Sequence, residues 1–158
     1  MDPKRLALGA AAALLALALW LAWLWQPERQ VRLHTASLLK AIERRNWSKV
    51  QGLFADNYSD RWGHDKAFVV SGLRQVFESF FTLSIEHRIL DADATSGRAT
   101  VRVKMSGQGP VASYVTAKIN GLGDPFTFTW QRSGGMPWQW QLISADHPTL
   151  EPDKELPF

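Results

Sequence analysis

Histidines and aspartates at three places in the sequence are the side chains whose chemistry could support catalysis. His87 lies between Ile85 and Ile89 in an alternating run, so we expect it on the apolar face of a strand. A neutral imidazole in that position could act as a general base, with Asp60 or Asp146 as its carboxylate partner. The structural alternative is a histidine bonded to a core neighbour, and the spacing alone leaves both open.

A second polar group lies between residues 60 and 65. Asp65 is expected to cap a helix, and His64 either pairs with Asp60 at the mouth of a cavity or lies in an exposed loop. The four histidines show no His-x-x-x-His or His-x-His spacing, and the chain has no cysteine. We therefore expect no metal site and no cofactor. A thiolate zinc site, an iron–sulfur cluster, a disulfide and a catalytic cysteine are excluded.

Large aromatic side chains after residue 60 could line a ligand pocket. Together with His87, the candidates are Trp62, Tyr114, Trp130, Trp138 and Trp140. Such a pocket would hold a small apolar ligand. The alternative is that these rings fill the concave face of a small sheet, which needs large side chains for its core.

The N-terminal segment has the properties of a membrane span. Residues 6–25 carry no charge and consist of alanine, leucine, one glycine and three tryptophans. A helix of that length measures about 30 Å, the thickness of a bilayer core. Trp20, Trp23 and Trp25 are expected at the headgroup level as an aromatic belt, and Pro27 is expected to end the helix. A cleaved signal peptide is the alternative, although its apolar region is shorter and ends in small residues.

The basic residues around this segment give opposing indications of its orientation. Residues 1–5 form a short tail in which Lys4 and Arg5 favour a cytoplasmic N-terminus, with the following domain on the periplasmic side of a bacterial inner membrane. Basic residues that follow the span favour the opposite orientation: Arg29, Arg32, Lys40, Arg44 and Arg45. We expect the periplasmic orientation, because the start of the chain resembles an export signal.

Most of the excess of positive charge lies in the segment after the span. Residues 26–50 hold six basic and two acidic side chains, whereas residues 51–158 hold ten basic and twelve acidic ones. The folded body therefore lacks the basic face that nucleic-acid binding requires, and we expect no nucleic-acid partner. A basic stretch beside a span instead favours contact with the anionic headgroups of the lipid bilayer.

Hydrophobic periodicity divides the rest of the chain into helices followed by strands. After a linker at residues 26–30, apolar residues recur every three or four positions and predict helices near 31–45, 47–54 and 65–81. Alternation then predicts strands near 83–89, 99–105, 126–130 and 138–142, and a less regular one near 114–122. This order predicts an α+β fold in which three helices pack on a curved antiparallel sheet of four or five strands. Residues 147–158 are rich in proline and are expected to form a loose C-terminal tail.

The stretch from Ala41 to Tyr58 resembles a known family. Its helix–tight turn–helix pattern, with Leu-Phe-Ala-Asp-Asn near the end, is similar to the nuclear transport factor 2-like superfamily, and the resemblance covers residues 31–146. The resemblance implies the cone-shaped α+β fold of ketosteroid isomerases and polyketide cyclases. In an ungapped alignment, the tyrosine and two aspartates that act in the isomerases fall at Leu38, Trp62 and Phe126. Apolar side chains cannot move a proton or stabilise an enolate, so isomerase chemistry is not expected.

Two functions of different classes remain compatible with the sequence. The first is a membrane-tethered, non-catalytic binding or scaffold module, an accessory subunit that holds a partner protein of a membrane complex or a small apolar ligand. This architecture is similar to that of assembly components of bacterial secretion systems. The second is a tethered lyase, hydrolase or isomerase-type enzyme with a polar site in the cone, using His87 with Asp60 or Asp146. A homodimer is also possible through the outer sheet face, which carries Arg88, Arg102, Lys104, Gln139 and Gln141.

Overall fold

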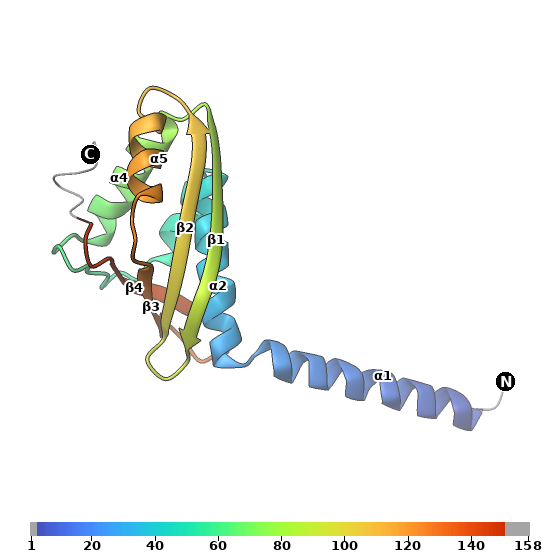
Figure 1. Cartoon of the computed structure of the whole chain (residues 1–158). Coiled ribbons are helices and arrows are strands. Elements are labelled where there is room, and N and C mark those ends of the chain that lie inside the picture. The colour runs from blue at the N-terminus through green and yellow to red at the C-terminus, as the bar shows by residue number, and fades with distance from the viewer. Residues whose placement is uncertain (1–2, 151–158) are drawn as a thin grey trace.

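A long N-terminal helix extends away from an α+β body (Figure 1). The computed structural model describes residues 3–150, with side chains from residue 8 onward. The helices are α1 (Pro3–Leu24), α2 (Pro27–Glu43), α3 (Trp47–Leu53), α4 (Lys66–Glu78) and α5 (Ala112–Asn120). The strands are β1 (Thr82–Asp93), β2 (Arg98–Gln108), β3 (Phe126–Arg132) and β4 (Trp140–Asp146).

Polar caps and one proline fix where the helices of the body begin. The Asn46 side chain accepts the Lys49 N–H at 3.1 Å at the start of α3, and Asp65 accepts the Phe68 N–H at 2.8 Å at the start of α4. The cap expected at Asp65 is therefore confirmed. Pro27 lies in the first turn of α2, where its fixed φ suits a helix and its missing N–H costs nothing. Because α2 begins there, the expected linker at 26–30 is wrong.

The sheet is an antiparallel meander in the order β1-β2-β3-β4. Its long β1–β2 pair places Ile85 opposite Met105 and Ile89 opposite Val101, with a bulge between Ile89 and Asp91. The turn between these strands requires glycine at position 97, where φ is +66° and a Cβ would lie 2.0 Å from the Trp130 carbonyl oxygen. The α+β class and the antiparallel sheet expected from the alternation are confirmed.

The segment expected to be a weak strand near 114–122 is instead the helix α5. Val115 and Ile119 are buried one turn apart, which is helical spacing, although Val115, Ala117 and Ile119 also alternate with polar residues as a strand would. The Asn120 side chain then ties α5 to β2, donating to the Met105 carbonyl at 2.8 Å and accepting the Met105 N–H at 2.7 Å. The described chain therefore has four strands, and the fifth is replaced by a helix on the sheet.

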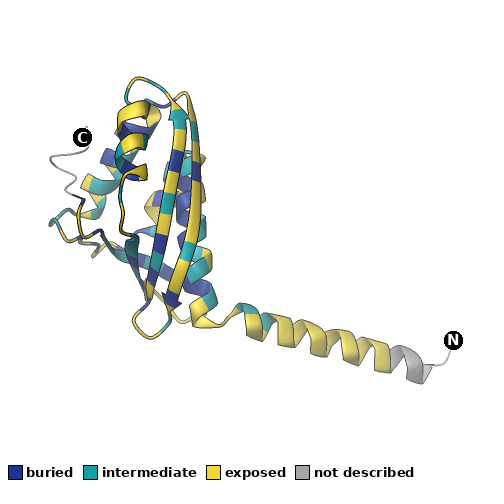
Figure 2. Ribbon diagram, in the orientation of Figure 1, coloured by how far each residue is buried: buried dark blue, intermediate teal, exposed yellow. Residues whose placement is uncertain are grey.

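Helices α2 and α5 pack against the long strands, and the buried residues lie between these layers (Figure 2). The largest fully buried side chains include Phe80, Leu38 and Leu142, together with Val31 and Val101. Leu38, Leu142, Val31 and Val101 come from apolar positions of the helical or strand period, whereas Phe80 lies in the connection between α4 and β1. The core therefore lies between the concave sheet face and its helices.

Residues 147–150 are packed rather than loose. His147 is 0 % exposed: its Nε2–H donates to the Asp124 carbonyl at 2.9 Å, and its Nδ1 accepts the Leu150 N–H at 3.1 Å. Leu150 is itself buried. The expectation of a loose tail is wrong for these residues because a satisfied polar group anchors them, and residues 151–158 lie outside the described chain.

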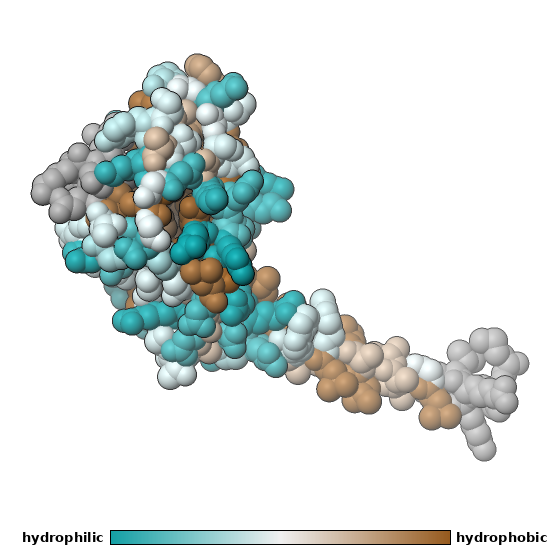
Figure 3. Space-filling view, in the orientation of Figure 1, coloured by the Kyte–Doolittle hydropathy of each residue, from teal (hydrophilic) through white to brown (hydrophobic). Residues whose placement is uncertain are grey.

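Helix α1 presents apolar side chains to its surroundings on every side. Residues 8–20 are all exposed, and hydrophobic residues run along the helix in Figure 3. Residues 3–5, expected in a tail, already belong to α1, while residues 1–2 lie outside the described chain. Among the described residues, no helix taken alone has both the length and the hydropathy of a membrane span. The pair formed by residues 8–24 and α2, bent by 69°, could meet both criteria on length and composition.

Candidate functional site

An apolar cavity of about 190 Å³ lies inside the body. Every helix of the body except α3, and all four strands, contribute to its wall, and nearly all of the side chains are hydrocarbon. The wall consists of Leu38, Leu39, Ile42, Phe54, Tyr58, Trp62, Val69, Leu73, Val76, Phe77, Ile85, Val103, Met105, Val115, Ile119, Phe126, Phe128, Leu142, Ala145, Asp146 and Leu150. The cavity is the concave site that the fold provides for a ligand.

The wall follows directly from the periodicity of the sequence. On α2, Leu38 and Ile42 lie one turn apart on the same side of the helix, and alternate strand positions such as Phe126 and Phe128 point to the same face. The three positions that align with the catalytic groups of the isomerases, namely Leu38, Trp62 and Phe126, all line the cavity. At these positions the cavity therefore carries apolar groups and lacks those an isomerase needs.

Asp60 and His64 form the hydrogen-bonded pair that the sequence suggested. The His64 Nδ1 lies 3.0 Å from Asp60 Oδ2, and the side chains are 13 % and 3 % exposed. The other Asp60 oxygen accepts the backbone N–H groups of Trp62 and His64, each at 2.9 Å. The His64 ring also stacks on Phe68, with centroids 4.4 Å apart. This carboxylate organises the turn at 60–64, and neither Asp60 nor His64 belongs to the cavity wall.

Two further polar groups lie at the edge of the cavity. Burial raises the pKa of the Tyr58 hydroxyl above its ordinary value, and the nearby Asp60 charge raises it further. The phenol is therefore neutral at physiological pH. Asp146 is half-exposed and lies 3.5 Å from the Arg61 guanidinium. Because Asp146 is half-exposed, it marks the solvent-facing rim of the cavity.

His87 lies on the face of β1 that the alternation predicted, but it is not covered by the core. Its side chain is exposed and is absent from the cavity wall, although Ile85 on the same face is buried. The catalytic pairing of a cavity His87 with Asp60 or Asp146 is therefore not formed, and only Asp146 of these three lines the cavity.

Of the other aromatic residues proposed for a pocket, only Trp62 lines the cavity. Tyr114 is 54 % exposed because α5 is a helix whose inner side carries Val115 and Ile119. Trp130 and Trp140 are buried at 2 % and 7 % exposure within the hydrophobic core cluster. For these two residues, the alternative of core filling is the one the structure shows.

The aliphatic wall is the part of the site that sequence reasoning missed. Val69 and Leu73 fall in the helix predicted at 65–81 and Met105 in the strand predicted at 99–105, and neither prediction assigns them to a site. The available signal was that the apolar faces of several elements converge on one concave space. Within residues 3–150, no group of three histidine, aspartate or glutamate side chains is arranged to hold a metal ion.

The three tryptophans of the expected belt lie at the C-terminal end of α1 and directly after it. Trp20, Trp23 and Trp25 are 53 %, 46 % and 39 % exposed. The Arg29 guanidinium lies 3.3 Å above the Trp23 ring, a cation–π contact between α1 and α2. These rings therefore form an exposed aromatic group at the junction with the body.

Solved structures share this fold at low sequence identity. A protein assigned as a dehydratase of the NTF2-like family from Streptomyces avermitilis has a TM-score of 0.53 and 17 % identity, covering 75 % of this chain and 93 % of that one. An NTF2-like protein from Pseudomonas putida has a TM-score of 0.51 and 15 % identity, covering 75 % of this chain and 82 % of that one. A protein assigned as an aromatic ring hydroxylase from Novosphingobium aromaticivorans has a TM-score of 0.52 and 11 % identity, covering 75 % of this chain and 85 % of that one.

These similarities establish the nuclear transport factor 2-like fold expected from the Ala41–Tyr58 stretch, and they establish the fold alone. No protein-family model matches the sequence, and no curated protein matches it. Because the similar structures differ in their assigned functions, the fold is compatible with a binding module and with an enzyme.

Proposed function

We propose that the chain is a membrane-tethered binding module whose cone holds a small apolar ligand. The observation that carries this proposal is the hydrocarbon wall of the cavity, including Leu38 and Phe126 at positions where isomerases have catalytic groups. Binding an apolar molecule against such a wall is favourable because it removes that molecule from water, and the ionisable groups among the lining residues, Tyr58 and Asp146, lie at the edge of the cavity.

The size of the cavity limits the ligand. A dry protein cavity of about 150 Å³ lined by leucine, isoleucine and phenylalanine binds benzene. The cavity here, of about 190 Å³, suits a neutral molecule of one substituted aromatic ring or a short branched hydrocarbon. A charged ligand would have to leave its charge at the rim, near Asp146 and Arg61.

The tether is supported by α1. Its exposed side chains are alanine, leucine and tryptophan without a charge, and such a surface is costly in water and favourable in lipid. We place the body on the periplasmic side of a bacterial inner membrane, on the strength of Lys4 and Arg5 at the N-terminus. A partner protein or a second copy of the chain would then meet the body there.

Methionine methyl groups give a direct test of ligand binding. The chain has three methionines, of which Met105 lines the cavity and Met136 is 51 % exposed. With ¹³C-methyl methionine in the detergent-solubilised full chain, benzene should shift the Met105 resonance in a saturable manner and leave Met136 unchanged. Equal or absent shifts for both methyl groups would contradict the proposal.

A pair of variants shows whether the effect belongs to the cavity. Ala145→Leu adds a bulky side chain to the wall, so it should weaken the benzene-induced shift of Met105. Leu90→Ala removes an exposed side chain at 43 % exposure and should leave the shift unchanged. Turnover of an added aromatic ester or alcohol by the wild-type chain, lost in His64→Ala, would instead favour the enzyme.

The tether is tested separately from the ligand. The full chain should remain with membranes after alkaline extraction, and Leu15→Arg in the middle of α1 should release it. Leu90→Arg on β1 is the matched control and should leave the chain bound to the membrane. A Ser113→Cys variant of the cysteine-free chain reports the side of the membrane, since an impermeant maleimide reaches only a periplasmic thiol in intact inner membranes.

A further inference from the structure

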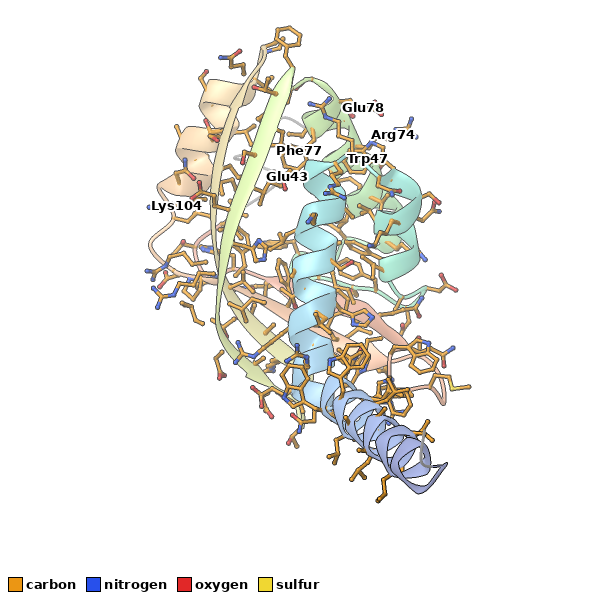
Figure 4. The ribbon with its side chains drawn as sticks, turned by 90° about the vertical axis from the view of Figure 1, so that its right-hand side faces the viewer. Glu43, Trp47, Arg74, Phe77, Glu78 and Lys104 are labelled. Atoms are coloured by element: carbon orange, nitrogen blue, oxygen red, sulfur yellow. The ribbon has the colours of Figure 1, made fainter. Side chains whose placement is uncertain are left out.

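The turn between β3 and β4 lies beside the base of α1. Its tip, residues 133–139, carries two exposed apolar side chains: Met136 at 51 % exposure and Trp138 at 49 %. The Trp138 ring contacts the Trp25 ring, with centroids 5.9 Å apart. Figure 4, which looks toward the body with α1 coming forward, shows the β3–β4 end of the sheet next to that helix.

The tip is held in one shape by its own hydrogen bonds. The Gln139 side chain accepts the Met136 N–H at 3.0 Å, and the Ser133 N–H donates to the Gln139 carbonyl at 2.9 Å. The Trp140 indole donates to the Pro137 carbonyl at 2.9 Å. Met136 and Trp138 are thus presented to the outside by an ordered turn, so holding them there requires little further ordering of the chain.

The charge of this region also differs from that of the rest of the body. Between residues 125 and 145 there is no acidic side chain, and Arg132 is the one basic residue. Because its own segment carries no acidic side chain, the apolar tip adds no repulsion from anionic lipid headgroups. Tryptophan rings favour the interfacial zone of a bilayer because they combine an apolar body with an N–H donor.

We propose that residues 133–139 form a second lipid-contacting element, which inserts Met136 and Trp138 into the interfacial zone of the bilayer beside Trp25. This inference rests on the proposed tether, because the rings of the tip reach lipid only if α1 spans it. The direct contact between Trp25 and Trp138 places the tip at the same depth as the end of the span. The body is therefore attached at two points and cannot rotate freely about its helix.

The absence of cysteine allows a site-by-site test in the full chain. Met136→Cys, Phe81→Cys and Leu15→Cys would each carry a bimane fluorophore, in vesicles of phosphatidylcholine and phosphatidylglycerol. Phe81 is 77 % exposed at the far end of β1 and reports water, while Leu15 reports the middle of α1. Quenching by aqueous iodide and by a lipid-borne nitroxide is measured at each position.

We expect iodide to quench position 136 severalfold less than position 81, and the lipid nitroxide to quench it severalfold more. Equal iodide quenching at 136 and 81, with position 15 still protected, would overturn this inference and leave the tether standing. Iodide quenching at position 15 would remove the tether and the inference together. Protection of position 136 from both quenchers would mean that protein covers the tip, which also overturns it.

A second variant isolates the role of the ring. In the Met136→Cys background, Trp138→Ser should raise iodide quenching at position 136 toward that of position 81 and leave position 15 unchanged. Gln131→Ser on the neighbouring strand, also exposed, is the matched control and should have no effect. An unchanged quenching constant in Trp138→Ser would contradict insertion through this side chain.

Discussion

Helix α1 and the wall of the cavity are built from the same class of side chain and face opposite ways. In α1 the apolar residues surround the helix and point outward, with Leu8, Leu14 and Leu15 more than 60 % exposed. In the body, Leu38 and Leu142 are at most 2 % exposed and point into the cone. The difference shows that composition sets how much apolar surface a segment has, whereas periodicity sets which way it faces.

The two regions should respond differently to the same loss of apolar volume, and this is the largest effect we expect. Phe80→Ala leaves a hole in the core and should lower the free energy of unfolding by about 3–5 kcal/mol. Leu17→Ala removes a half-exposed side chain of α1 and should change it by less than about 0.5 kcal/mol. Urea titrations of both full-length variants in detergent check the prediction, and similar losses would show that α1 is part of the folded core.

The buried polar side chain of His147 gives a second test of the difference between the body and α1, because α1 offers no counterpart to it. His147→Phe keeps a ring of similar size and leaves the Asp124 carbonyl and the Leu150 N–H without their partner. We expect the free energy of unfolding to fall by about 1–3 kcal/mol. The measurement is again urea unfolding, and His87→Phe on the exposed strand is the control that should have little effect.

The pH dependence of the body has a specific contribution from Tyr58. Burial raises the pKa of its hydroxyl in the folded state, so the folded form holds the proton more tightly than the unfolded form. The stabilisation that comes from this raised pKa is fully present at pH values below the unfolded-state pKa of about 10. Above that pH, the free energy of unfolding falls by up to about 1.4 kcal/mol per pH unit. Tyr58→Phe should remove this loss.

The chain's other tyrosine, Tyr114, is half-exposed and serves as the matched control. Unfolding of wild type, Tyr58→Phe and Tyr114→Phe would be compared across the alkaline range. If Tyr114→Phe removed the alkaline loss and Tyr58→Phe did not, the burial of Tyr58 would be the wrong explanation.

The smallest effect concerns a helix end. Asp65→Ala removes the acceptor for the Phe68 N–H and should cost about 1 kcal/mol, whereas Asp65→Asn keeps an acceptor and should cost less. Thermal unfolding of the two variants checks the difference. A loss of equal size in both would point to the charge of Asp65 rather than its hydrogen bond.

Local patterns predicted the elements of this fold well where a cap or a long period was present. The cap expected at Asp65 predicted the start of α4, and the alternation predicted β1 and β2. Segment 112–120 was less predictable, since nine residues with mixed apolar spacing suit a strand or a helix, and packing on β2 decides. The burial of His147 depends on Asp124, which is distant in sequence and leaves no local signal.

The site was harder to predict than the fold. The sequence left two interpretations open for the aromatic residues of the sheet, a ligand pocket or core filling, because alternation shows which face a residue takes and not what covers it. Trp130 and Trp140 fill the core. The exposure of His87 likewise depends on what packs over its position on β1, which is a tertiary property with no local sequence signal. The three positions that align with the catalytic groups of the isomerases, Leu38, Trp62 and Phe126, did indicate where the cavity lies, since all of them line it.

The bulge in β1 has a consequence for the behaviour of the chain in concentrated solution. A long edge strand presents unpaired amide and carbonyl groups, to which the edge of another molecule could add. Between Ile89 and Asp91 the register shifts by one residue, so a straight incoming strand would lose its match there. The charged side chains of Glu86, Arg88 and Asp91 further discourage such pairing, and β1 thereby protects the body against growth into fibrils.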